Sequence, residues 1–150
     1  MEASVLLELQ DTVAAYAGIM SRVAQVEVEV VDEHMFRIAG TGIFEGHVNE
    51  DMSSEGYVYR HVLRTGNMEI IHEPGREELC QNCPKRNVCR EEIEISMPIR
   101  LGGKSIGVIG LIGSSREQKA SPSAAVTSPL GSNRFPALPM TIFLAARSSA

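Results

Sequence analysis

The sequence predicts a mixed α/β (α+β) domain in which a central antiparallel sheet of about five strands is flanked by helices. Three observations predict this class. Residues 4–24 have a helical apolar period, residues 26–31 and 92–99 alternate between polar and apolar, and residues 105–113 are apolar on both faces. The chain has 150 residues, of which 43% are hydrophobic, so it is long enough to bury the core of one domain.

The charge and hydropathy of the chain argue against two classes of function. Its formal net charge of −5 offers no basic excess for binding phosphates, so we expect no direct binding of nucleic acid. The longest apolar run, residues 106–112, is far shorter than the roughly 20 residues that cross a membrane. The N-terminus has no basic segment of the kind that begins a secretory signal. We therefore expect a cytoplasmic protein that does not contact the membrane.

Residues 1–25 are predicted to form an N-terminal amphipathic helix. Its apolar residues are spaced alternately three and four apart: Leu6, Leu9, Val13, Tyr16, Met20 and Val23. Such a seam packs either on the sheet of its own domain or against a second copy of the chain. We expect a homodimer through this seam, with docking on the chain's own sheet as the alternative.

Residues 26–119 contain the remaining predicted elements. The alternating segments 26–31 and 35–39 form a hairpin, and residues 54–65 form a helix. Ser53 or Ser54 would cap the start of that helix, and Gly66 its end.

Three further strands are predicted at residues 68–72, 92–99 and 105–113. The last should lie at the centre of the sheet, because a strand that is apolar on both faces must be covered on both. The order helix, strand, strand, helix, strand, strand, strand is the plan of a small sensory domain of the GAF or PAS type.

Residues 120–150 differ from the rest in composition. All 19 acidic residues precede this segment, which holds four of the seven prolines and shows neither a helical nor an alternating period. We expect a disordered tail, because such a segment cannot offset its ordering entropy by burying apolar surface. The alternative is translation from a shifted reading frame after residue 119, which would make the chain a fragment.

The cysteine-rich segment 80–89 is the densest group of chemically active residues. Cys80, Cys83 and Cys89 have the spacing C-x2-C-x5-C. A C-x2-C pair brings two thiolates of one turn to a single metal, and a third can fold back from five residues on. The pattern predicts a cofactor, either zinc or an iron–sulfur cluster, held by these three cysteines.

This ligand set is one short of the four that zinc or a cubane cluster needs. The fourth ligand would be His72, Glu77 or Glu78, an exogenous group, or a residue of another protomer. The second interpretation is a set of reactive or regulatory thiols, whose thiolate form nearby cations such as Lys85 and Arg86 would favour. The third is inert surface cysteines.

Residues 26–119 resemble the N-terminal sensory domain of sigma-54-dependent transcriptional activators from anaerobic bacteria. The resemblance is carried by four groups of residues: Val28 to Glu33 with Arg37 to Ile43, Glu55 to Tyr59 with Val62 to Gly66, Cys80 to Pro84 through Cys89, and Glu94 to Ile99 with Ile106 to Ile112. It implies a signal-receiving module that precedes an ATPase and a DNA-binding helix-turn-helix. The chain contains neither a P-loop nor a recognition helix, and the resemblance stops near residue 119.

Two functions follow from these expectations. The first is a non-enzymatic sensory domain of a transcriptional regulator, which responds to a small molecule or a redox signal, with or without a metal held by its cysteines. The second is a thiol-based redox enzyme, because some GAF domains of this size resemble it and reduce methionine sulfoxide. We favour the sensor, because thiols so close in sequence leave little room for a substrate pocket between them.

Overall fold

The computed structural model describes residues 2–118, and the predicted tail at residues 120–150 lies outside the described residues. Its centre is a five-stranded antiparallel sheet in the order β2-β1-β5-β4-β3. The strands are β1 (Glu27–Asp32), β2 (Arg37–Gly40), β3 (Glu69–Ile71), β4 (Ile93–Leu101) and β5 (Lys104–Gly113). The predicted hairpin, the three later strands and the central place of the last strand are all confirmed.

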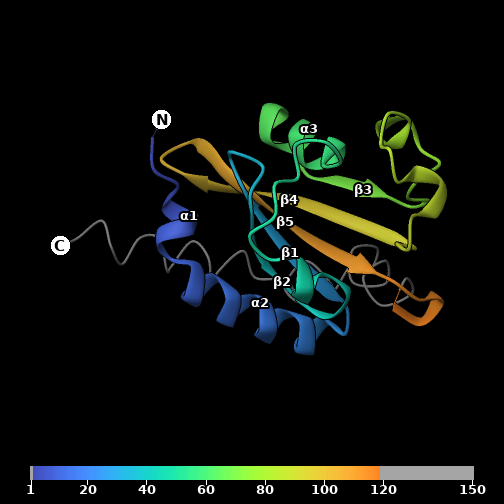
Figure 1. Ribbon diagram of the computed structural model, residues 1–150, viewed down its shortest axis with the longest axis horizontal. Helices are drawn as coiled ribbons and strands as arrows, with labels where there is room; N and C mark the ends of the chain where they lie inside the picture. The colour runs from blue at the N-terminus through green and yellow to red at the C-terminus, as the bar shows by residue number, and fades with distance from the viewer. Residues whose placement is uncertain (1, 119–150) are drawn as a thin grey trace, which may run out of the picture.

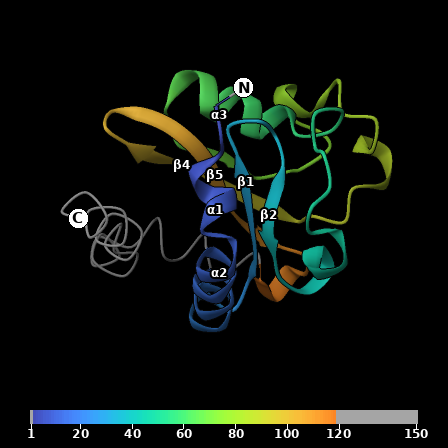
Figure 2. The same ribbon diagram turned by 60° about the vertical axis from the view of Figure 1, so that its left-hand side comes forward.

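Helices cover both faces of the sheet. They are the α-helices α1 (Val5–Glu8), α2 (Gln10–Ala24) and α3 (Tyr57–Thr65), and the short 3-10 helices η1 (Gly42–His47), η2 (Glu78–Cys80) and η3 (Arg86–Val88). Figures 1 and 2 show α2 and α3 on opposite sides of the sheet. Among residues 2–118, no helix is long and apolar enough to cross a membrane.

Each face of the sheet has its own apolar cluster. On the α2 face, Val13 and Ala17 pack with strand residues such as Val28, Ile95 and Leu111. On the α3 face, the cluster is smaller: Val31, Met35, Met52, Tyr59, Val62 and Val108. This second face is therefore only partly apolar, and it leaves room for polar groups beside the core.

The N-terminal helix differs from the prediction in two respects. It is interrupted at Leu9, which ends α1 and precedes α2, and Ser4 caps α1 by accepting a hydrogen bond from the backbone N–H of Leu7. The predicted seam also packs largely on the chain's own sheet, because Leu6 and Val13 are fully buried there and Leu9 and Met20 contact the same cluster. These four residues are not free to face a second copy, which corrects the predicted dimer seam.

Helix α3 begins at Tyr57, three residues later than predicted, with Gly56 at its N-cap. Ser53 is instead held in the preceding turn, where its backbone N–H and hydroxyl both donate to the Asp51 carboxylate. The predicted end of the helix is confirmed. Gly66 adopts a left-handed conformation, with φ at 66°, and its N–H bonds to the carbonyl of Val62.

Candidate functional site

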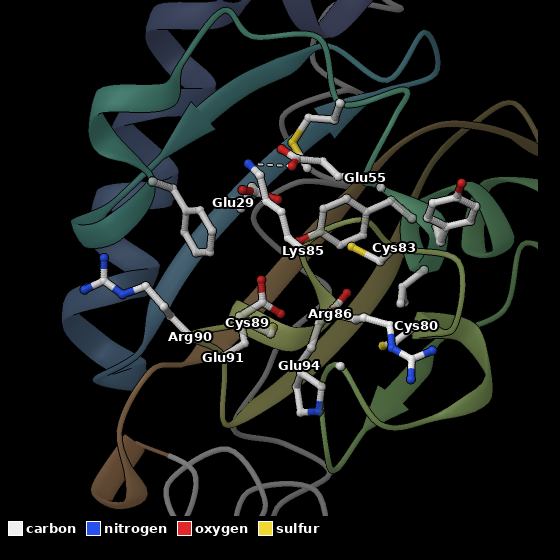
Figure 3. A pocket seen from close by; sticks show the side chains of 18 of the residues that line it. Glu29, Glu55, Cys80, Cys83, Lys85, Arg86, Cys89, Arg90, Glu91 and Glu94 are labelled. Atoms are coloured by element: carbon white, nitrogen blue, oxygen red, sulfur yellow. Dashed lines mark ion pairs between the residues drawn. The ribbon is translucent and has the colours of Figure 1, made fainter.

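A pocket of about 250 Å³ lies on the α3 face of the sheet. Its walls are the sheet, η1, the start of α3 and residues 74–91, which we call the cap segment (Figure 3). The cap segment is the connection between β3 and β4 and contains η2 and η3. A concave site of this size, lined by both apolar and charged groups, suits a small polar ligand.

The sheet wall of the pocket carries a buried ion pair. Arg37 of β2 donates from Nε to a carboxylate oxygen of Glu29 on β1 at 2.8 Å, and both side chains are about 95% buried. Arg37 also donates to the carbonyl of His47 at 2.9 Å and to Glu50 at 3.2 Å, and its guanidinium lies 5.8 Å from the ring centre of Phe44. These contacts fix the guanidinium, so that it is a rigid part of the wall.

Tyr59 of α3 lies across the sheet next to this pair. Its hydroxyl hydrogen-bonds to Glu29, and burial raises the pKa of Tyr59 well above its usual value. The ring fits because Gly110 of β5, the register partner of Glu29, has no side chain. Burial also raises the pKa of Glu29, against the opposing effect of Arg37.

A second acidic group in the pocket comes from the start of β4. Glu94 is buried and accepts a hydrogen bond from the hydroxyl of Ser96 at 2.5 Å. Burial raises its pKa to about 7, and burial together with the charge of Glu94 raises the pKa of Glu91. Glu91 and Glu94 are hydrogen-bonded, which requires a proton on one of the two carboxyl groups.

The cap segment is attached to the domain by an apolar contact, an ion pair, and hydrogen bonds of Glu77 and Glu91 to residues just outside the segment. Cys80 and Leu79 pack against Val58 of α3 and Ile71 of β3. At the other end, Lys85 donates from Nζ to Glu55 at 2.6 Å (Figure 3). Glu55 lies in the turn before α3, so this ion pair joins the cap segment to the rim of the pocket.

The three cysteines predicted as ligands all line the pocket, but they differ in exposure. Cys80 is buried, Cys83 is half-buried and Cys89 is exposed. Burial raises the pKa of Cys80, and partial desolvation beside Glu91 raises that of Cys89 to about 11. Both thiols are therefore protonated at neutral pH, which disfavours nucleophilic attack.

The arrangement does not gather a ligand set for a metal. Within residues 2–118, no three histidine, cysteine, aspartate or glutamate side chains are placed so that they could hold a metal ion. Glu77, one candidate for the fourth ligand, accepts hydrogen bonds from the backbone N–H groups of His72 and Glu73. Zinc or cluster binding by Cys80, Cys83 and Cys89 would thus require the cap segment to rearrange.

Sequence reasoning did not single out Glu29, Arg37, Tyr59 or Glu94 as site residues. In the sequence, Glu29 and Glu94 have the pattern of solvent-facing positions on alternating strands. One available signal is the complementary charge of Glu29 and Arg37 on the two strands of one hairpin. Glu29 is opposite Gly40 and Arg37 is opposite Val31, so the two residues are diagonal neighbours whose long side chains can reach each other.

The chain is similar in sequence to a putative uric acid sigma-54-dependent transcriptional regulator, UacR, of Escherichia coli strain K12. The two are 34% identical over 116 residues, which is 77% of this chain and 20% of the regulator. The chain thus spans about a fifth of the length of that relative. No protein-family model matches the chain.

Solved structures show the same fold at low sequence identity. A GAF domain/HD domain protein from Geobacter sulfurreducens superposes with a TM-score of 0.56 at 15% identity, over 80% of this chain and 88% of that one. A type II free methionine-R-sulfoxide reductase from Thermoplasma acidophilum gives 0.56 at 18% identity, over 84% and 94%. The GAF fold and the resemblance to sigma-54-dependent regulators, both expected from the sequence, are confirmed.

Proposed function

We propose that this chain, a GAF domain homologous to a segment of a sigma-54-dependent transcriptional regulator, is the signal-receiving module of such a regulator and binds a small ligand under the cap segment. The observation that carries the proposal is the pocket itself. It joins a rigid charged wall, formed by Glu29 and Arg37, to a cap segment whose exposed Lys85 forms an ion pair with Glu55 at the rim. A ligand that contacts both would change how the cap segment sits on the domain.

The first ligand to test is uric acid, for which the E. coli relative is named. A purine of this kind is planar and carries several N–H and C=O groups. The aromatic rings of Phe44 and Tyr59 offer partners for the planar ring system. The polar groups of Glu94 and Arg37 offer partners for its N–H and C=O groups.

We propose that the chain is not an enzyme. Reduction of methionine sulfoxide begins with attack by a thiolate, whereas the raised pKa values of Cys80 and Cys89 keep those thiols protonated. The likeness to the Thermoplasma acidophilum reductase concerns the fold, and fold does not determine activity.

The test is a titration of the full chain with uric acid by isothermal calorimetry. We expect binding in the micromolar range and weaker binding by Val88→Trp, because Val88 lines the pocket and the larger side chain narrows it. Met68→Trp is the matched control. Met68 is likewise an exposed apolar residue, at 48% against 73% for Val88, but it does not line the pocket. Absence of heat in the wild type, or equal binding by the two variants, would contradict a urate site in this pocket.

A further inference from the structure

The carboxylate of Glu55 lies between two cations at the pocket. Its Oε2 is 2.6 Å from Lys85 Nζ in the cap segment, and its Oε1 is 4.0 Å from Nη2 of Arg37 in the sheet wall. The Glu55 side chain is only 16% exposed, so this anion is held largely inside the protein. It also directly precedes Gly56, the N-cap of α3, where the helix dipole favours negative charge.

The two cations at this end of the pocket differ in how many carboxylates they contact. Arg37 is paired with Glu29 at 2.8 Å and with Glu50 at 3.2 Å, whereas Lys85 is paired with Glu55 at 2.6 Å. If the Glu55 carboxylate swings out, Lys85 loses this partner, while Arg37 keeps its bonds to Glu29 and Glu50. An anionic ligand can replace the Glu55 carboxylate as the partner of Lys85, whereas a neutral ligand cannot.

Exchange is feasible on geometric grounds, because the two cations differ in mobility. Arg37 is fixed by its bonds to Glu29 and to the His47 carbonyl, whereas the Lys85 side chain is 65% exposed and free to follow a new partner. Glu55 lies in a turn and not in a strand or helix, so its side chain can leave without breaking backbone structure.

We propose that Arg37 and Lys85 form a subsite for one anionic oxygen of the ligand, and that the Glu55 carboxylate occupies this subsite until the ligand replaces it. The ligand class is therefore a small monoanion: a carboxylate, an oxyanion or a deprotonated heterocycle. This inference rests on the proposed function, because it assigns the ligand's charge in the same pocket. It also gives the ligand a direct contact with Lys85, so that exchange of Glu55 for ligand keeps the cap segment attached.

The test compares the wild-type chain with Glu55→Gln at pH 7.5. The probes are urate, which is a monoanion at this pH, and hypoxanthine, a neutral purine of similar shape. Removing the internal competitor should tighten urate binding about five- to tenfold, as expected from the strength of a partly exposed ion pair, and leave hypoxanthine binding unchanged. Glu45→Gln is the matched control, because Glu45 is exposed on η1 and does not line the pocket. It should bind both probes as the wild type does.

A second variant tests the cation. Lys85→Gln should weaken urate binding about five- to tenfold while its unfolding midpoint stays near that of the wild type, because Lys85 is mostly solvent-exposed. The subsite is overturned if Glu55→Gln binds urate no more tightly than the wild type does, including the case in which neither binds. It is also overturned if the substitution raises the affinity for hypoxanthine as much as the affinity for urate. If the wild type binds urate and Glu55→Gln binds it no more tightly, the subsite alone is refuted and the proposed function still holds.

Discussion

Gly110 of the central strand lies directly beneath the hydroxyl of Tyr59. A Cβ added to Gly110 would overlap that hydroxyl. Glu29, the partner of the hydroxyl, is opposite Gly110 in the β1–β5 register, so the missing side chain in β5 allows a residue of α3 to reach a carboxylate of β1. The polar wall of the pocket therefore depends on a glycine that contributes no group to it.

Gly110→Ala should lower the free energy of unfolding by about 1–3 kcal/mol, because the Tyr59 ring must move and its hydrogen bond to Glu29 is lost. The chain has no tryptophan, so urea unfolding is followed by far-ultraviolet circular dichroism. In a Tyr59→Phe background the same substitution should cost about 1 kcal/mol less, because the overlapping hydroxyl is absent.

Gly18→Ala is the control for this experiment. Gly18 lies inside α2 with no atom near the position of an added Cβ. The substitution should stabilise the domain by up to about 1 kcal/mol, through helix propensity. Equal effects of the alanine at both positions, or no coupling between positions 59 and 110, would refute the contact.

Glu94 makes the stability of the domain depend on pH. Because its pKa is raised from 4.5 to about 7, the folded state binds a proton more tightly than the unfolded chain. The stabilisation from this proton is fully present below about pH 4.5 and is lost as the pH rises through 7. Its upper limit is about 3 kcal/mol.

Glu94→Gln removes this titration while keeping an acceptor for Ser96. Relative to the wild type, the variant should gain stability between pH 5 and pH 8, by about 1–3 kcal/mol. The measurement is the difference in urea unfolding free energy at the two pH values. Glu92→Gln, at an exposed neighbouring position, should show no such trend. A pH-independent difference between wild type and Glu94→Gln would contradict a raised pKa.

The strands and the central place of the last one were predictable, because alternation and a doubly apolar segment report directly on burial. The same alternation gave no indication of the site residues. In β1 the apolar residues Val28 and Val30 face α2, and the intervening Glu29 has the pattern of a solvent-facing residue. Glu29 is 2% exposed because α3 and the cap segment cover the second face as well, and no local pattern encodes that cover.

The cysteine segment shows a different limit. The spacing of Cys80, Cys83 and Cys89 indicates which sulfurs can come together, but it does not indicate the direction of each side chain. Cys80 instead packs in an apolar cluster with Val58 and Ile71, two residues that are distant in sequence. The sequence therefore located the segment that covers the pocket, while the role of each thiol depended on tertiary packing.

Metal analysis separates the two interpretations of these thiols. As the cap segment is arranged, we expect the anaerobically purified chain to hold well under one equivalent of zinc or iron, and all three thiols to react with a thiol reagent after unfolding. One equivalent of metal, or visible absorption with acid-labile sulfide, lost in Cys83→Ser but not in Ser121→Ala, would instead support the metal site predicted from the spacing.

An assay of turnover tests the proposal that the chain is not an enzyme. With free methionine-R-sulfoxide, thioredoxin, its reductase and NADPH, the chain should oxidise NADPH no faster than a Cys80→Ser/Cys83→Ser/Cys89→Ser variant. The physical reason is the small thiolate fraction of Cys80 and Cys89 at neutral pH. Cysteine-dependent turnover that saturates with methionine sulfoxide would refute the non-enzymatic assignment.

Helix α2 carries two apolar stripes, and only one of them packs on the sheet. Val13 and Ala17 are buried, whereas Ile19 and Val23 are 48% and 78% exposed. The homodimer expected from the sequence would therefore have to use the exposed stripe. We predict that Val23→Glu shifts the chain from dimer to monomer in sedimentation at tens of micromolar and leaves its unfolding midpoint unchanged.

Val13→Glu is the informative comparison, because the original seam predicts that this substitution also disrupts the dimer. On the described packing it should instead unfold the domain, since it places an unpaired charge in the core at a cost of several kcal/mol. Circular dichroism measured beside sedimentation distinguishes the two effects. A folded, monomeric Val13→Glu with a dimeric Val23→Glu would place the interface at the seam residues that pack on the sheet, Leu6, Leu9, Val13 and Met20. A wild type that sediments as a monomer throughout would refute the homodimer itself.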